Sequence, residues 1–499
     1  MLVTIISIVL SAFLLWLVPK VATAISSPLN AIPNASITAP FSRLWLLWTR
    51  ATGTEYSTCL AAHRRLGPVI RIGPKEISIN SIDDGICTVH GANWEKSSMY
   101  DVRLVARLTE CLHNSFSPLF AVRQGKSQSE RRRLYTHVYS KSTIINSIEL
   151  GRILSTIIHD RLLPRLREAT TKGDDIDVYS LTKEYSMDVV TAYVYGLGNG
   201  TNWTGKPDKA SHHLLAFQSA LEPWAFFAST EIMRLASSLS WLGIKLISPP
   251  VDAAFDAIHS FVLDLTQNAI KQLDMTHLGE SDSMGTFKDI WQRIKLLPEE
   301  KLNLIASDMV DQTHAGHEAT GIILTYVMFE LSRHAEVQTR LRNELRSSDD
   351  PRGSKMLDAV LMETMRLYPA GIGPFPRVAP ANATINGFTI PKGTIATASP
   401  YMLGRNSEVF PNPDAWLPER WLKADVDEQR QMRQWVWLFM SGPRNCIGEH
   451  LAVFAMKAFI ADIYSSYHTT TTGNQDMRQL ESFFATPASS SLPLKFHSV

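Results

Sequence analysis

The sequence is poor in cysteine and balanced in charge, and both facts exclude whole classes of protein. It has four cysteines in 499 residues, far fewer than a small disulfide scaffold uses. No two of them form a Cys-x-x-Cys pair, so a structural zinc site of the usual spacing is not predicted. Lysine and arginine total 49 against 48 aspartates and glutamates, a net charge of +1. The chain as a whole therefore shows no electrostatic preference for nucleic acid.

Internal repeats and long low-complexity runs are also absent. The length alone would suggest about three domains, but no linker-like stretch divides residues 56–499. We therefore predict one domain over residues 56–499. A linker that contains several prolines is predicted for residues 20–55.

Residues 1–19 carry no charged side chain and are mostly apolar, and Lys20 ends the run. At about 1.5 Å per residue, such a helix just spans a bilayer core of roughly 30 Å. The competing interpretation is a signal peptide, because Ala22-Thr23-Ala24 resembles a cleavage site. No basic residue precedes the apolar run, however, and positive charges follow it. The positive-inside rule then predicts a single-pass transmembrane anchor in the endoplasmic reticulum membrane, with the body in the cytosol.

Helical periodicity dominates the body, and β patterns occupy short segments near its two ends. One apolar-periodic stretch runs from Leu302 to His334 without proline, and another runs from Met356 to Tyr368 and stops at Pro369. Residues 69–79 indicate one hairpin, and residues 383–390 indicate a second with Asn-Gly at its turn. The predicted fold class is mainly α with a minor β portion.

One cysteine lies in a pattern of unusual specificity. Residues 439–448 read Phe-Met-Ser-Gly-Pro-Arg-Asn-Cys-Ile-Gly and match F-x-x-G-x-R-x-C-x-G at every defined position, with Cys446 as the cysteine. A chance match in a chain of this length is on the order of one in ten thousand. The pattern resembles the cysteine loop of the cytochrome P450 family. The resemblance covers roughly residues 60–499, and it implies that family's helical haem domain with small β-sheets.

The resemblance assigns a role to each defined residue of this loop. Cys446 is expected to bind the iron of haem b as a thiolate, an electron-rich ligand that favours O–O cleavage. The apolar-periodic run after it predicts a helix whose N-terminal N–H groups stabilise the negative sulfur. Gly442 is expected to permit a tight turn, and Gly448 a close approach of the backbone to the macrocycle. Phe439 is expected to shield the sulfur, and Arg444 to pair with a haem propionate.

A second set of residues resembles the family's buried ion network. Glu363 and Arg366 lie three residues apart on a predicted helix, so their charges share one face. By resemblance, Arg420 joins them. Their role is expected to be structural, and removal of one partner from such a network costs roughly 3–5 kcal/mol.

An arginine-rich run over residues 123–133 resembles a family helix that meets the haem propionates. Arg132 keeps the expected arginine, whereas Gln128 stands where the family usually has an aromatic residue or histidine. An amide hydrogen bond or the loss of that contact is therefore expected at Gln128. Arg377 matches a further propionate partner.

Residues 315–320, Ala-Gly-His-Glu-Ala-Thr, resemble the family's oxygen-activation motif A-G-x-[DE]-T-[TS] in the middle of the long helix. Gly316 costs about 1 kcal/mol in a helix interior, and it is expected to let the helix pass close to the haem. Glu318 is expected to relay protons through water toward bound oxygen. Ala319 departs from the family, which usually has a threonine hydroxyl there. Three compensations remain open: the hydroxyl of Thr320, a hydroxyl of the substrate, or a chemistry that needs less proton delivery.

Mixed aromatic and aliphatic segments are expected to line a lipophilic substrate pocket: residues 100–117, 224–227, 311–314, 370–375 and 483–486. The resemblance implies a monooxygenase that uses O₂ to hydroxylate or epoxidise a lipophilic small molecule. The sequence is similar to those of fungal family members that act in secondary-metabolite pathways.

The redox partner and two competing functions complete the predictions. No flavin or nucleotide motif is present, so electrons are expected from NADPH through a separate reductase. Its acidic flavin domain would face Arg123, Lys126, Arg131 and Arg133. A haem-thiolate isomerase or dehydratase that needs no external electrons is the second hypothesis, which Ala319 keeps open. A non-enzymatic haem-binding protein is the third.

Overall fold

The structure is a computed structural model that describes residues 18, 21–22, 24–101, 117–220, 222–275 and 286–499. The anchor predicted for residues 1–19 lies outside these described residues, apart from Val18. Within the described part of the chain, no helix has both the length and the apolar character that a membrane crossing requires.

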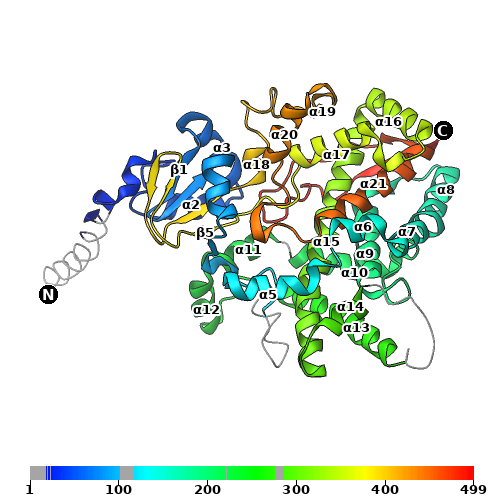
Figure 1. The fold of residues 1–499 in the computed structure, drawn as a ribbon, viewed down its shortest axis with the longest axis horizontal. Coiled ribbons are helices and arrows are strands. Elements are labelled where there is room, and N and C mark those ends of the chain that lie inside the picture. The colour runs from blue at the N-terminus through cyan, green and yellow to red at the C-terminus, as the bar shows by residue number, and fades with distance from the viewer. Residues whose placement is uncertain (1–17, 19–20, 23, 102–116, 221, 276–285) are drawn as a thin grey trace.

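A large helical body packs against a smaller lobe rich in β-structure, which lies to the left in Figure 1. The prediction of a mainly helical chain is confirmed. The helices are α2 (Leu44–Ala51), α3 (Glu55–Leu66), α5 (Gly125–Thr136), α6 (Lys141–Asn146), α7 (Ile148–Ser155), α8 (Leu163–Lys172), α9 (Val178–Tyr195), α10 (Pro207–Ala220), α11 (Pro223–Thr230), α12 (Met233–Trp241), α13 (Pro249–Met275), α14 (Phe287–Arg293), α15 (Pro298–Arg333), α16 (Ala335–Ser347), α17 (Lys355–Leu367), α18 (Pro400–Leu403), α19 (Glu419–Lys423), α20 (Val426–Trp435) and α21 (Glu449–Ser466).

The strands form small sheets, and both predicted hairpins are present. A sheet has the order β1-β2-β8-β5-β3, a second β4-β10-β9, and the third is the β6-β7 hairpin. At the turn of that hairpin, Asn386 and Gly387 both have positive φ, 47° and 80°, as a type I′ turn requires. The strands are β1 (Val69–Gly73), β2 (Glu76–Ile79), β3 (Glu95–Lys96), β4 (Ile176–Asp177), β5 (Arg377–Val378), β6 (Ala383–Ile385), β7 (Phe388–Ile390), β8 (Ile395–Thr397), β9 (Tyr467–Thr471) and β10 (Pro493–Ser498).

Part of the segment predicted as a linker is folded onto the β-rich lobe. A short 3₁₀ turn (Pro28–Ala31) and α2 lie in it, and the side chains of Leu29 and Leu46 are buried. The backbone N–H of Arg71 donates to the carbonyl of Pro33 at 2.8 Å. These contacts attach the segment to β1.

Helix α15 is the long helix predicted from Leu302 to His334, and it packs along α9. Two glycines allow this close packing. A methyl group at Gly316 would lie 3.1 Å from Cγ2 of Val190, and one at Gly321 would lie 2.9 Å from Cγ of Lys183. Gly316 therefore has a packing role against α9 in addition to the expected one beside the haem.

The predicted ion network of Glu363, Arg366 and Arg420 is present and buried at the end of α17. Arg366 donates to both carboxylate oxygens of Glu363 at 2.8 and 2.9 Å, and Arg420 donates to Oε1 at 3.0 Å. Trp421 Nε1 and the backbone N–H of Leu417 complete the acceptors of Glu363, each at 2.9 Å. The remaining guanidinium bonds of Arg366 go to the carbonyls of Gly404, Pro413 and Ala415.

Candidate functional site

A largely apolar cavity lies between α5, α9, α15 and the loop that precedes α21. Most of the predicted site residues meet there, although they are spread over more than three hundred positions of the chain. Those that line the cavity are Arg132, Gly316, Thr320, Phe439, Arg444, Cys446 and Gly448.

The loop that carries Cys446 is shaped by its own backbone. The N–H of Cys446 donates to the carbonyl of Phe439 at 2.8 Å. Gly442 has a φ of +74°, and a methyl group there would lie 2.2 Å from the carbonyl oxygen of His90. Only glycine is compatible with this approach, so the expected tight turn at Gly442 is present, although Gly442 itself is not on the cavity wall that the structure describes.

Helix α21 begins directly after this loop, as predicted. Burial raises the pKa of the Cys446 thiol, whereas hydrogen bonds from the backbone of Gly448 and Glu449 and the charge of Arg132 act to lower it. These N–H groups and the positive end of the α21 dipole stabilise a thiolate.

Arg132 and Arg444 fix the cysteine loop from two sides. Arg132 donates to the carbonyl and to Oδ1 of Asn445, both at 2.7 Å. Arg444 donates to Oδ1 of Asn93 at 2.8 Å and to the carbonyl of Arg123 at 2.7 Å. Arg132 therefore holds the residue next to the cysteine, whereas Arg444 ties the loop to the segments of Asn93 and Arg123, and both residues line the cavity.

A lysine that the sequence did not single out also lies at this site. Lys96 is buried, lines the cavity and donates to the carbonyl of Phe120. Burial lowers the pKa of Lys96 well below its usual value, and the charges of Arg377 and Arg444 lower it further. Arg377 is also buried, and its Nη1 atom has no hydrogen-bond partner among the described residues. An anionic group beside these side chains would offset their mutual repulsion.

The oxygen-activation segment of α15 is divided between the cavity and the protein interior. Ala315, Gly316, Ala319 and Thr320 line the cavity. Glu318 is absent from the cavity wall that the structure describes, and its side chain is fully buried. It pairs instead with Lys183 of α9, a second residue that sequence analysis missed.

The predicted substrate segments meet this cavity in part. Asp311, Gln312, Gly371, Phe375, Phe483 and Phe484 line it. Burial raises the pKa of Asp311 to about 7, and its carboxylate accepts a hydrogen bond from the N–H of Phe120 at 2.9 Å. In the 224–227 segment, the ring of Phe226 lies 5.7 Å from that of Phe483 and so forms an outer layer. Most of the 100–117 segment lies outside the described residues.

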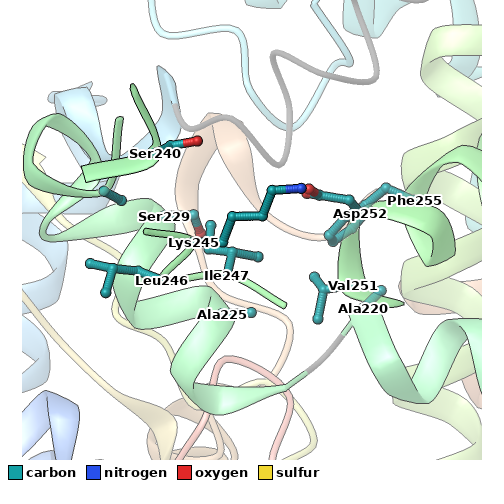
Figure 2. Close-up of a pocket in the computed structure, with 11 residues that line it drawn as sticks. Ala220, Ala225, Ser229, Ser240, Lys245, Leu246, Ile247, Val251, Asp252 and Phe255 are labelled. Atoms are coloured by element: carbon teal, nitrogen blue, oxygen red, sulfur yellow. The ribbon is translucent and has the colours of Figure 1, made fainter. Parts of the chain in front are cut away.

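A separate pocket lies between α10, α11, α12 and α13 (Figure 2). Small side chains such as Ala220 and Ala225 line it, and Figure 2 shows the amine of Lys245 pointing toward Asp252 at its rim. None of the predicted catalytic, cofactor-binding or metal-binding residues contributes to it, although Ala225 belongs to the predicted substrate segment 224–227. Most of those residues line the cavity at Cys446 instead.

Comparison with known proteins agrees with this geometry. The family model for cytochrome P450 matches residues 39–493. The chain belongs to the cytochrome P450 family. Similar proteins include a cytochrome P450 monooxygenase of Aspergillus terreus, 25% identical over 87% of this chain and 90% of that protein. Cytochrome P450 monooxygenase aba2 of Botryotinia fuckeliana is 27% identical over 89% and 84%, and avaI of Aspergillus versicolor is 26% identical over 78% and 92%.

The residues of the cavity fit the haem-thiolate group that a cytochrome P450 carries. Cys446 is half-buried on a largely apolar wall, and the basic side chains Lys96, Arg132 and Arg444 lie on the same cavity. Gln128 also lines it, and its Oε1 is buried without a partner among the described residues. A hydrogen bond from this amide, one of the two outcomes expected at Gln128, stays a prediction. The chain is therefore an enzyme of the P450 monooxygenase type.

One expectation about the arginine run is wrong. Arg131, predicted to face a redox partner, turns inward and pairs with Asp308 of α15 at 2.8 Å. The buried carboxylate of Asp308 requires a positive partner, and this requirement places Arg131 in the interior. Lys126 and Arg133 remain exposed on α5.

Proposed function

We propose that this P450 inserts one atom of O₂ into a lipophilic small molecule, by hydroxylation or epoxidation, in a secondary-metabolite pathway. The observation that carries the proposal is the shared cavity of Cys446 and the α15 segment Ala315 to Thr320. Its mainly apolar wall favours a lipophilic substrate held by burial. The fungal monooxygenases among the similar proteins support the pathway class.

Bound haem b would supply the iron chemistry that activates O₂, with Cys446 as its thiolate ligand. Arg132, Arg444 and Lys96 would balance the charge of the propionates. Arg132 also holds Asn445, so it fixes the position of the neighbouring cysteine. The aromatic side chains of Phe375 and Phe483 exclude water and orient the substrate. Thr320 brings the hydroxyl group of the motif to the cavity wall.

An NADPH-dependent reductase is the proposed electron donor, and the exposed cations of α5 are its proposed docking site. Lys126 and Arg133 are exposed on the helix that also carries Arg132. This helix contacts the cysteine loop through Asn445. An acidic flavin domain that docked here would lie on the Cys446 side of the protein.

Exposed apolar side chains support the proposed attachment to the endoplasmic reticulum membrane. Trp241 at the end of α12 is 87% exposed, and Leu242 and Ile244 follow it on the surface. Leu44 and Trp48 of α2 are also exposed. Figure 1 shows α12 and the start of the described chain in the same half of the molecule. Apolar groups of this kind suit a lipid interface, which agrees with the anchor predicted from the sequence of residues 1–19.

The carbon monoxide difference spectrum of the reduced protein tests the proposal. Wild type is compared with Cys446→Ser in membranes. We expect a strongly red-shifted Soret band in wild type and its loss in the variant. A folded, haem-loaded wild type without that band would contradict the thiolate ligand and the monooxygenase with it. Turnover of substrate without a reductase would instead favour the isomerase or dehydratase, which the similar proteins do not support.

A further inference from the structure

Asp311 of α15 is the only acidic residue on the cavity wall at Cys446 that the structure describes. Its Oδ2 atom accepts a hydrogen bond from the backbone N–H of Phe120 at 2.9 Å. No described residue forms a hydrogen bond or an ion pair with its Oδ1 atom. The side chain is half-buried, and Oδ1 is accessible from the cavity. One carboxylate oxygen is therefore available to a bound molecule.

Asp308, three residues earlier on α15, shows how a structural carboxylate is held in the same helix. Its side chain is fully buried. It accepts hydrogen bonds from Arg131 at 2.9 Å, from the hydroxyl of Tyr135 at 2.6 Å and from the backbone N–H of Leu119 at 2.8 Å. Asp311 has one such donor and no ion-pair partner among the described residues. The cost of removing its charge from water is therefore not offset within the described protein.

Aromatic rings line the same cavity as Asp311. The side chains of Phe120, Phe375, Phe483 and Phe484 all contribute to its wall. The ring centroid of Phe483 lies 5.8 Å from that of Phe120, 5.7 Å from that of Phe375 and 5.2 Å from that of Phe484. The faces of such rings attract a cation, and their area also buries apolar groups. A carboxylate and a ring cluster on one cavity suit a ligand that is both cationic and lipophilic.

We propose that the substrate is a lipophilic amine and that Asp311 binds its positively charged nitrogen. The apolar groups of the amine then fill the rest of the cavity. This inference rests on the proposed monooxygenase function and gives that function a substrate class. The ion pair fixes one point of the molecule, so atoms at a set distance from the nitrogen face the oxygen-activation segment. Asp311 is thus a specificity-determining residue.

The pKa of Asp311 gives this binding a pH dependence. Burial raises that pKa to about 7, although the hydrogen bond from Phe120 acts to lower it. The charged groups near Asp311 are Asp308 of α15, Lys96 of β3 and Arg131 of α5, with Arg132 and Arg444 elsewhere on the cavity wall. Asp311 becomes a carboxylate as pH rises through about 7, and a bound cation favours that form. Affinity for a cation should therefore increase from pH 6 to pH 8.

Azoles that coordinate the haem iron measure this charge selectivity without the natural substrate. Imidazoles with an N-alkyl arm that ends in a trimethylammonium group are compared with isosteres that end in a tert-butyl group, over a series of arm lengths. Both kinds bind the iron and shift the Soret band, so the ratio of their dissociation constants reports the effect of the charge. At one arm length or more, we expect wild type to bind the cationic azole about tenfold more tightly than its isostere at pH 8. This preference should disappear or reverse in Asp311→Asn, which keeps the shape of the side chain.

The pH series and a second variant identify the source of the selectivity. The preference for the cation should grow from pH 6 to pH 8 in wild type and lose most of that growth in Asp311→Asn, where Lys96 and the imidazoles still titrate. Asp289→Asn is the matched control, because Asp289 is exposed on α14 and should leave the ratio unchanged.

Two results would overturn the proposal: no preference for the cation at any arm length in wild type, or an equal preference in Asp311→Asn. Asp311→Ser replaces Asp311→Asn if the latter does not fold. Failure of the neutral azoles to bind wild type, together with loss of its carbon monoxide band, would instead contradict the haem-thiolate site and with it the proposed function.

Discussion

Two buried glutamates of this P450, Glu363 on α17 and Glu318 on α15, differ in how many groups donate hydrogen bonds to their carboxylates. Glu363 accepts hydrogen bonds from Arg366, Arg420, Trp421 and the backbone of Leu417. Glu318 accepts a hydrogen bond from Lys183 alone among the described residues. Both carboxylates have a lowered pKa, because their cations outweigh burial.

The number of partners separates a structural carboxylate from one that can move. If the side chain of Glu363 rotated, the donors that now bond to it would be left unpaired. Arg366 would lose its counter-ion as well. Burial without a partner is costly for each such group. Glu318 gives up one partner only, so its rotation disturbs far less of the structure. The Glu363 network therefore ties several segments of the chain together, whereas the Lys183–Glu318 pair leaves Glu318 with a single hydrogen-bond partner among the described residues.

The largest expected effect is the loss of the Glu363 network. Glu363→Gln leaves the guanidinium groups of Arg366 and Arg420 buried without a counter-ion, and we expect a loss of roughly 3–5 kcal/mol in the free energy of unfolding. Chemical unfolding followed by circular dichroism measures it, and the yield of haem-loaded protein should fall in parallel. Glu168→Gln is the control, because its pair with Lys172 is exposed on α8. Equal unfolding midpoints for the two variants would contradict the structural role of the network.

A smaller effect is expected where Gly321 admits the side chain of Lys183. In Gly321→Ala the new methyl group would lie 2.9 Å from Cγ of Lys183 and 3.3 Å from its backbone, so α9 or the ion pair must shift. We expect a loss of about 1–3 kcal/mol in the free energy of unfolding. Gly151→Ala on α7 is the matched control, because a methyl group there meets nothing within 4 Å. Helix propensity alone should make that control neutral or stabilising by roughly 0.5–1 kcal/mol. A neutral Gly321→Ala would show that the contact is loose.

The same comparison shows which features the sequence could predict. Glu363 and Arg366 share one face of one helix, and the stop at Pro369 defines the end of that helix, so local spacing was sufficient. The cysteine loop and the Asn-Gly hairpin are also local patterns. Lys183 and Glu318 are 135 positions apart, and a single lysine in a helical pattern usually indicates a solvated face. The prediction that Arg131 faces a redox partner was wrong for the same reason, because its partner Asp308 lies 177 positions away.

The smallest expected effect is a difference in alkaline stability between the two ion pairs. The folded-state pKa of Lys183 is raised, so its contribution to stability is complete below the unfolded value of about 10.5. That contribution is lost as pH rises through the higher folded-state pKa. The Glu363 network contains no lysine. On the acidic side, both glutamates have a lowered pKa and lose their contribution only as pH falls below about 4.5.

Thermal unfolding between about pH 8 and pH 11.5 isolates the lysine. Tyrosines and other lysines titrate in this range in every variant, so the informative quantity is the difference in Tm between wild type and Lys183→Arg. An arginine keeps its charge at these pH values, and the variant should therefore lose less stability than wild type above pH 10.5. A Tm difference that stays constant with pH would show that Lys183 does not titrate as a charged partner of Glu318. The two buried carboxylates would then differ in the number of their hydrogen bonds but not in the titration of their partners.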